Sequence, residues 1–358
     1  MVFLGGPRQV GKTTLALSLL PKPSKTAPGY LNWDIPEHRE LIRRDLLPAV
    51  PPLLILDEIH KFKYWRRTVK GFYDQFYPDR RCIVTGSARL DFYRRGGDSL
   101  VGRYHYYRLH PFTLPELGDV SALSQLFEYG GFPEPFLKAD ATFYRRWNAE
   151  RTARVVQEDV MSLEKLGDLS LLELLIDALP ARVGSVLSIN SLAEDLERNH
   201  ATIKRWLEIL SRFYIAFIIP PFHSSKLRAV KKAPKLYLWD WAQVADDGPR
   251  FENMVACHLL KYCHYRQDTE GRRFELQYLR DRDGREIDFV VLENRKPTFA
   301  VECKLNERRE IGSLLRLKEL LAIPRLYQVH LSAIDTGSAQ KGVRLLPFER
   351  LCSEEGLV

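Results

Sequence analysis

Residues 6–13, which read Gly-Pro-Arg-Gln-Val-Gly-Lys-Thr, constrain the fold of this chain more than any other segment. Two glycines followed by Lys-Thr at this spacing form the pattern of a phosphate-binding loop. An apolar stub at residues 2–4 precedes the loop, and apolar residues at helical spacing follow it, at Leu15, Ala16, Leu19 and Leu20. The strand, loop and helix order is the setting that this motif requires, so a nucleoside triphosphate is the first ligand to consider.

Each part of the loop has an expected role. Glycines at 6 and 11 let backbone N–H groups curl around phosphates, Lys12 reaches the terminal phosphates, and the Thr13 hydroxyl ligates magnesium. The helix that follows directs its positive dipole end toward the same anion. We therefore predict ATP and Mg²⁺ as cofactors, held by Gly6, Pro7, Arg8, Gln9, Val10, Gly11, Lys12, Thr13 and Thr14.

A second motif lies at residues 53–58, Leu-Leu-Ile-Leu-Asp-Glu, where a continuous apolar run ends in two carboxylates. Such a run is typical of a buried parallel strand, and the pattern is the Walker B signature. Asp57 is expected to hold the magnesium ion directly or through water, and Glu58 to polarise the water that attacks the γ-phosphate. The alternative is an acidic turn after a core strand. Glu58 beside Asp57 favours hydrolysis over nucleotide sensing.

The first third of the chain alternates strand and helix signals, which predicts an α/β fold with a parallel sheet. Strands are expected at 30–34, 53–57, 82–87 and 104–109, and helices at 36–46 and from 65 to 76. The strand at 82–87 ends in small polar residues where a parallel sheet opens onto its ligand. Thr85 or Ser87 is predicted to orient the attacking water, and a capping hydroxyl is an equal alternative for each.

A cation near the γ-phosphate is the remaining catalytic part. Arginines follow the fourth strand at positions 89, 94, 95 and 103, and Arg103 is the preferred candidate for an arginine finger, acting in cis or on a neighbouring subunit. Solvated surface charge is the alternative for any one of them.

Length and composition set outer limits. A chain of 358 residues predicts two or three domains, and a formal net charge of +8 permits a polyanionic partner without requiring one. Five cysteines lack the paired spacing of a zinc site or a disulfide framework, which indicates reduced thiols. No apolar run reaches the length of a bilayer span, and no secretory signal pattern opens the chain. We expect a cytoplasmic protein without a membrane partner.

Taken together, five motifs resemble the prokaryotic AAA+ ATPases that carry a carboxy-terminal domain of unknown function. They are residues 6–14, 57–61, 85–87, 99–103 and the Gly-Gly-Phe-Pro-Glu at 130–134. The resemblance runs over nearly the whole chain. It implies an ATPase that forms homo-oligomers, with a P-loop AAA+ domain at 1–118, a helical region with a winged helix-turn-helix at 119–245, and a nuclease-like α/β domain at 246–358.

The middle third has helix-turn-helix spacing. A helical pattern at 189–196, capped by Asn190 or Ser191, and a polar turn at 198–200 precede an apolar stripe at Ile203, Leu207, Leu210 and Tyr214. The exposed face of the second helix carries Thr202, Lys204, Arg205 and Glu208, and a basic wing is expected from Lys226, Arg228, Lys231, Lys232 and Lys235. Such a unit can grip DNA through phosphates. A packing module is the favoured alternative, because Glu208 interrupts the basic face.

The last third holds a second candidate site. Asp288 follows a hairpin signal at 283–284, and Glu302 and Lys304 lie on the next predicted strand. Asp288 and Glu302 are expected to hold a magnesium ion, with Lys304 orienting water for phosphodiester attack and Glu252 as a further carboxylate. The arrangement resembles the PD-(D/E)xK nuclease superfamily. A surface salt bridge between Glu302 and Lys304 is the alternative.

Three functions follow from these motifs. The first is an ATPase whose hydrolysis cycle remodels a partner, either a protein or a nucleic acid, through the carboxy-terminal regions. The second is a nucleotide-gated, Mg²⁺-dependent DNA or RNA nuclease. The third is a nucleotide-switched signalling module with slow turnover.

Overall fold

The computed structural model of the protein describes residues 1–48, 52–86, 100, 102–160, 169–222, 233–281, 284–306, 312–335 and 342–358. The chain divides into two compact units, Met1–His110 and Pro111–Val358. The first unit holds the phosphate-binding loop, and the second holds the helix-turn-helix pattern and the carboxylates of the last third.

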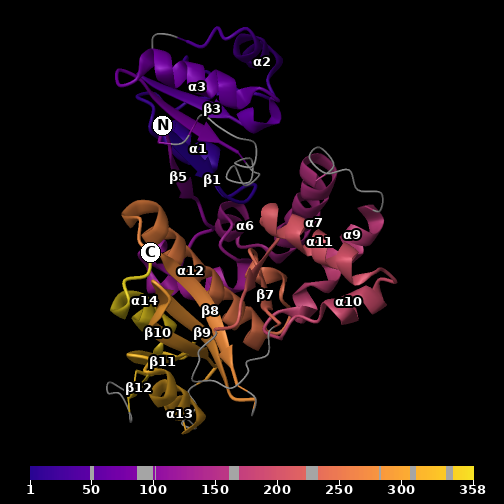
Figure 1. Ribbon diagram of the computed structural model, residues 1–358, viewed down its shortest axis with the longest axis vertical. Helices are drawn as coiled ribbons and strands as arrows, with labels where there is room; N and C mark the ends of the chain where they lie inside the picture. The colour runs from indigo at the N-terminus through magenta and orange to yellow at the C-terminus, as the bar shows by residue number, and fades with distance from the viewer. Residues whose placement is uncertain are drawn as a thin grey trace. The chain divides into compact units, whose positions relative to one another are not determined.

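The first unit is built on a five-stranded parallel sheet with the strand order β2-β3-β4-β1-β5 (Figure 1). The strands are β1 (Val2–Gly5), β2 (Tyr30–Asn32), β3 (Leu53–Asp57), β4 (Arg81–Thr85) and β5 (His105–Arg108). Asp57 pairs with Thr85 on one side and with Asn32 on the other. The predicted α/β fold of a P-loop NTPase is thereby confirmed, and the carboxyl ends of four strands meet beside the loop.

Helices cover both faces of this sheet, as the apolar strands require. They are α1 (Lys12–Ser18), α2 (Pro36–Arg43) and α3 (Trp65–Phe76), with a short 3₁₀ turn, η1 (Ile59–Lys61). Ile55 packs with α1 on one face, whereas its neighbours Leu54 and Leu56 pack with α3 on the other. This alternation follows from the two-residue period of a strand. The helix predicted over 36–46 ends earlier, at Arg43.

The second unit opens with a helical region. Its elements are α4 (Leu114–Leu117), α5 (Leu123–Tyr129), α6 (Pro133–Lys138), α7 (Ala141–Arg154), a π-helical turn η4 (Val155–Val160), α9 (Leu169–Ala178), α10 (Ile189–Asp195) and α11 (His200–Arg212). A two-stranded antiparallel sheet, β6 (Ala216–Ile219) with β7 (Lys235–Leu238), follows α11. The order of helix, turn, helix and hairpin matches the predicted pattern, and its assignment as a winged helix stays a prediction.

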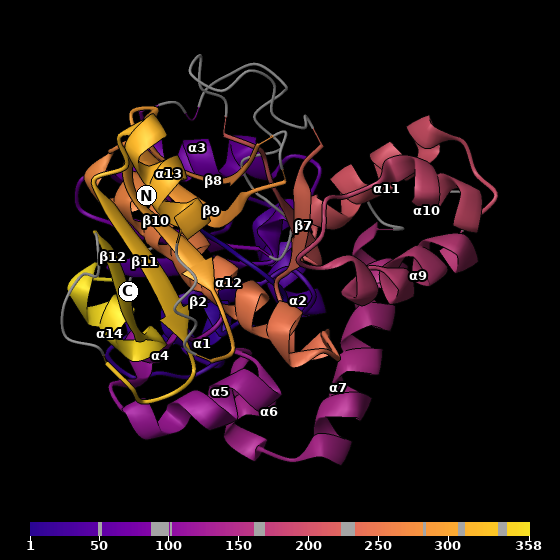
Figure 2. The same cartoon turned by 90° about the horizontal axis from the view of Figure 1, so that it is seen from below.

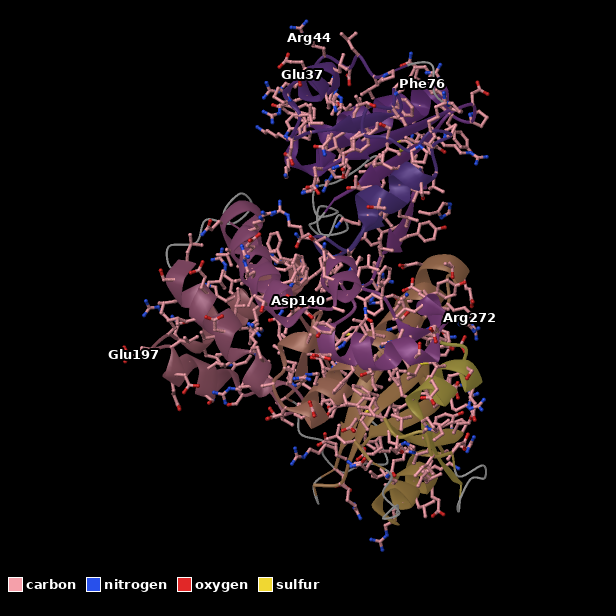
Figure 3. The ribbon with its side chains drawn as sticks, turned by 180° about the vertical axis from the view of Figure 1, so that it is seen from behind. Glu37, Arg44, Phe76, Asp140, Glu197 and Arg272 are labelled. Atoms are coloured by element: carbon pink, nitrogen blue, oxygen red, sulfur yellow. The ribbon has the colours of Figure 1, made fainter. Side chains whose placement is uncertain are left out.

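The caps of the helix-turn-helix differ in part from expectation. Ser188, not Asn190 or Ser191, caps α10 by accepting a hydrogen bond from the Ser191 N–H at 3.2 Å. Asn199 caps α11 through the Thr202 N–H at 2.9 Å. Between the two helices the chain turns at Glu197, whose φ is 50° and whose side chain is exposed (Figure 3).

The Gly-Gly pair at 130–131 is a packing feature of the second unit. A Cβ on Gly130, whose φ is 76°, would lie 2.6 Å from an Asp240 carboxylate oxygen, and one on Gly131 would lie 2.4 Å from the Phe112 carbonyl oxygen. The buried Trp241 side chain also contacts this position and donates its indole N–H to the Leu126 carbonyl at 2.9 Å. Only glycine leaves room for this close approach.

A mixed five-stranded sheet with the order β12-β11-β10-β9-β8 ends the chain. Its strands are β8 (Phe274–Arg280), β9 (Glu286–Glu293), β10 (Lys296–Cys303), β11 (Arg325–His330) and β12 (Val343–Pro347). The long helix α12 (Asp247–Glu270) packs on one face through Tyr262 against Phe299, and α14 (Phe348–Glu354) packs beside it. Leu314 and Leu317 of α13 (Gly312–Leu321) pack on the other face (Figure 2).

Hydrogen bonds join the middle region of the second unit to its last region. The side-chain amide of the buried Asn253 on α12 bonds both the Leu238 N–H, at 2.8 Å, and the Leu238 carbonyl, at 2.7 Å. The final residue of β7 is therefore joined to α12 as if to a neighbouring strand.

Across the described residues, no helix is both long enough and apolar enough to cross a bilayer.

Candidate functional site

The loop between β1 and α1 depends on its glycines. Gly6 has φ 148°, and a Cβ there would lie 2.3 Å from the Leu109 carbonyl oxygen. Gly11 has φ 97°, and Gln9 also lies in the left-handed region at φ 63°. These angles favour glycine and let successive N–H groups turn toward one centre.

The Lys12 side chain lies inside the loop. It is buried, and its ammonium group donates to the carbonyl oxygens of Gly6, at 3.1 Å, and Pro7, at 2.5 Å. The loop therefore holds the lysine at the place where the motif requires a cation for phosphate oxygens.

Several donors fix the orientation of the Asp57 carboxylate. Its Oδ2 accepts from Thr13 Oγ1 at 2.9 Å, from Tyr30 Oη at 2.7 Å and from Asn32 Nδ2 at 3.3 Å. The buried Thr85 hydroxyl donates to Oδ1. Thr13 and Asp57, predicted from motifs 44 residues apart, are thus brought together. Hydroxyl and carboxylate oxygens are the ligands that Mg²⁺ prefers, so this pair fits the predicted ion.

Tyr30 and Asn32 are site residues that the motifs did not identify. They lie at the end of β2, where Asn32 pairs with Asp57 in the parallel register. Burial raises the pKa of Tyr30, an effect that the Asn32 hydrogen bond opposes and the charge of Asp57 reinforces, so the hydroxyl stays protonated and donates to Asp57. The polar ending of the predicted strand at 30–34 was the available signal.

Glu58 follows the strand in the left-handed region, with φ 54°, and its N–H bonds the Thr85 carbonyl at 3.2 Å. Its Oε2 lies 3.7 Å from His60 Nε2 and 3.6 Å from Lys61 Nζ. Burial lowers the pKa of His60 to about 3, so this imidazole is neutral at physiological pH. Lys61, which also pairs with Asp34 at 2.7 Å, is therefore the charged neighbour of the Glu58 carboxylate.

Arg103 lies at the amino-terminal end of the sheet's strands, whereas the phosphate-binding loop lies at their carboxyl end. It precedes β5, its carbonyl accepts from the Met1 amino group at 3.0 Å, and its Nε lies 2.9 Å from an Asp74 carboxylate oxygen. Because the phosphate-binding loop leaves the carboxyl end of β1, Arg103 does not face the loop of its own chain, which corrects the expectation of a role in cis. Ser87, Arg89, Arg94 and Arg95 lie outside the described residues.

The second unit brings the predicted carboxylates of the last third together. Asp288 Oδ2 accepts from the Cys303 N–H at 2.9 Å, and Glu302 Oε2 accepts from the Asp288 N–H at 3.3 Å. Lys304 Nζ lies 2.6 Å from Glu302 Oε1, so the predicted pair forms an ion pair. Glu252 of α12 joins the same cluster through a lysine.

That lysine is Lys235, which the sequence pattern assigned to a basic wing. Its side chain is 1% exposed, and its Nζ lies 3.0 Å from Glu252 Oε1 and 3.4 Å from Asp288 Oδ1. It also forms an ion pair with Glu286. The wing assignment of Lys235 is therefore wrong, because this ammonium group is buried among carboxylates. The other predicted wing residues, Lys226, Arg228, Lys231 and Lys232, lie outside the described residues.

This arrangement does not fit the predicted magnesium site. Within the described part of the chain, no three Asp, Glu, His or Cys side chains are grouped so as to hold a metal ion. Ammonium groups already neutralise the carboxylates from two sides. Burial, and next the charge of Asp288, raise the pKa of Glu252 to about 7 and that of Glu302 to about 8.

The raised pKa of Glu302 predicts a pH-dependent stability. The ordinary pKa is 4.5, so the folded chain binds this proton more tightly than the unfolded chain. The stabilisation is complete below about pH 4.5 and is lost as the pH rises through about 8. We expect the free energy of unfolding, measured with urea from about pH 5 to pH 8, to fall more steeply in the unsubstituted chain than in Glu302→Gln, by up to about 1.4 kcal/mol per pH unit. Equal slopes would contradict the protonated state of Glu302.

The exposed face of α11 carries Lys204, Arg205 and Glu208, with Thr202 half-buried beside them. The structure therefore leaves these side chains at the surface, and Glu208 remains among the basic residues as the sequence showed.

Family models match three successive parts of the chain. Residues 1–118 match an AAA domain, residues 120–245 match a domain of unknown function (DUF8612), and residues 247–351 match another domain of unknown function (DUF4143). The AAA match supports a nucleotide-binding ATPase.

Curated relatives are similar over part of their length. Two uncharacterized proteins, one from Mycobacterium bovis and one from Mycobacterium tuberculosis, are each 24% identical over 244 residues, which cover 67% of this chain and 54% of the relative. The chain thus spans about half the length of the relatives it matches. Among solved structures, the Thermotoga maritima RuvB Holliday junction branch migration motor has a TM-score of 0.29 at 19% identity, over 61% of this chain and 82% of that one.

Proposed function

We propose that this chain binds and hydrolyses ATP at the edge of the first sheet and couples that cycle to a partner through its second unit. The observation that carries the proposal is the contact of Thr13 with Asp57 at 2.9 Å beside a glycine-dependent loop. The AAA domain match over the same residues supports it independently.

Each residue of the site has a role in this proposal. Lys12 and the loop N–H groups bind the phosphates, and Thr13 and Asp57 hold the Mg²⁺ that accompanies ATP. When bound, the ion neutralises charge on the phosphate oxygens. Tyr30, Asn32 and Thr85 keep the Asp57 carboxylate in one orientation through their hydrogen bonds. Glu58 orients the attacking water and accepts its proton.

The coupling proposal rests on the second unit. A protein or nucleic-acid partner would contact the exposed face of α11, where the side chains of Lys204 and Arg205 lie at the surface and carry the charge that an acidic surface or phosphates attract. Arg103 does not face its own loop, so a role as an arginine finger would require a second chain whose loop it reaches. The oligomer is therefore part of the proposal.

A metal-dependent nuclease is the weaker candidate function. Asp288, Glu302 and Lys304 do lie together, as that activity requires. The neutralising position of Lys235 favours a different role for the cluster, and we therefore place the ATPase first.

Calorimetric titration of ATP and Mg²⁺ into the full-length chain tests the proposal directly. We expect saturable binding of about one nucleotide per chain, and phosphate release in a parallel assay. Absence of heat with well-folded protein would overturn it. Binding without phosphate release, alone or with DNA, RNA or candidate proteins, would instead support the nucleotide-switched signalling module.

A further inference from the structure

The carboxylate cluster of the second unit is organised around the ammonium group of Lys235. Glu252 approaches from α12, and Glu286 and Asp288 approach from β9. Tyr237 Oη also donates to Glu252 Oε1, at 2.6 Å, which fixes that carboxylate beside the lysine. Three acidic side chains from two elements therefore converge on one buried cation.

Such an arrangement is costly unless its charges are matched. Removing a lysine and several carboxylates from water is strongly unfavourable for each ion, and only close pairing offsets this. In this cluster the offset is provided by one ammonium group in contact with all three carboxylates. Lys304 and Arg280 pair at its edges, with Glu302 and Glu286.

The carboxylates of this cluster have the chemistry of divalent-cation ligands, although within the described residues they are not grouped so as to hold a metal ion. Carboxylate oxygens on adjacent strands and a facing helix are the groups that Mg²⁺ and Mn²⁺ select. Asp288 and Glu302 were predicted as such ligands from the sequence, and the structure places an ammonium group against Asp288 instead.

We propose that Lys235 is the resident cation of this cluster, that it takes the place of a divalent metal ion, and that it excludes such an ion while β7 stays docked on α12. The docking is specific, because two hydrogen bonds join Leu238 of the same strand to Asn253. The hairpin strand after the helix-turn-helix and the acidic cluster of the last region are therefore linked: the cluster takes up a metal ion only when the lysine leaves.

Manganese titration of the full-length chain without nucleotide tests this exclusion, read by calorimetry and by the electron paramagnetic resonance signal of free Mn²⁺. We expect no stoichiometric binding at this cluster in the unsubstituted chain. Lys235→Met keeps most of the length of the side chain and removes the charge, and we expect its Mn²⁺ affinity to rise at least about tenfold, with a Mn²⁺-dependent increase in melting temperature. Adding Asp288→Asn to that variant should abolish the gain.

Lys261→Met is the matched control. Lys261 is another largely buried lysine of the second unit, and among the described residues its ion pair is with one carboxylate, that of Glu116, at 2.5 Å. Its replacement should lower stability without creating Mn²⁺ binding, so a gain in Lys261→Met would show that the effect is not specific to the cluster and would overturn the proposal.

A second variant provides the test if Lys235→Met does not fold. Lys235→Met with Glu252→Gln removes one charge of each sign, which limits the buried excess, and leaves Glu286, Asp288 and Glu302 as ligands. No gain in Mn²⁺ affinity in either soluble variant would overturn the proposal. The unsubstituted chain gives a further test. Mn²⁺ binding that Asp288→Asn abolishes would overturn the proposal, and the absence of binding up to millimolar Mn²⁺ would support it.

Discussion

Glu58→Gln is expected to leave ATP bound and to lower phosphate release by about 10²- to 10³-fold. The amide has nearly the shape of the carboxylate, so the loop, Lys12 and Asp57 keep their positions, but it cannot accept a proton from water. General-base catalysis contributes rate factors of about 10² to 10⁴, which sets the size of the loss. Binding would be measured by calorimetry and turnover by phosphate release in the same preparation.

Glu40→Gln provides the control for this experiment. Glu40 lies on α2 in the same unit, its side chain is 54% exposed, and its ion pairs within the part of the chain that the structure describes are with the neighbouring Arg43 and Arg44. Its replacement changes the net charge by the same amount, and turnover should stay within about twofold, as expected of an exposed helix pair. If turnover in Glu58→Gln also stayed unchanged, Glu58 would have no part in the hydrolysis step.

The parts of the nucleotide site that could be predicted are those that lie in short continuous motifs. Thr13 follows the loop lysine, and Asp57 ends an apolar strand, so local pattern alone places Thr13 at the start of a helix and Asp57 at the end of a buried strand. Their contact at 2.9 Å follows because parallel strands present their carboxyl ends at the same edge. The two motifs therefore predict the positions of Thr13 and Asp57 without reference to the rest of the chain.

Tyr30 and Asn32 could not be predicted in the same way. Their role depends on β2 lying next to β3, which is a property of strand order and not of either segment. Arg103 shows the opposite case, a residue that the local pattern predicted and that strand register places away from the loop. Its place after an arginine-rich segment suggested a catalytic finger, but the register of β5 on β1 puts it at the amino-terminal edge.

Lys235 illustrates why charge patterns mislead for buried groups. A run of basic residues indicates a solvated wing, since lysine is rarely buried. Its actual environment is set by carboxylates 17 and 53 positions further along the chain, at Glu252 and Asp288. Only the packing of β7 between α12 and β9 reveals that the lysine belongs to the acidic cluster.

Lys12→Ala is expected to weaken both nucleotide binding and turnover, because it removes the cation that the loop holds against the terminal phosphates. We expect ATP affinity to fall by at least about tenfold and turnover by more than about a hundredfold, since phosphoryl transfer depends on positioning and charge stabilisation. Calorimetry and phosphate release with the purified variant give the two numbers separately.

The loss must be distinguished from unfolding. Lys12 Nζ donates to the carbonyls of Gly6 and Pro7, so its removal leaves two acceptors to be satisfied by water at a cost of about 1–3 kcal/mol. A melting curve would show whether the fold survives. Lys22→Ala, at an exposed position of the same unit, is the control for lost positive charge and should bind ATP as the unsubstituted chain does. Unchanged ATP affinity in folded Lys12→Ala would mean that the nucleotide is bound elsewhere, and the contact between Thr13 and Asp57 would then be a structural hydrogen bond at a strand end.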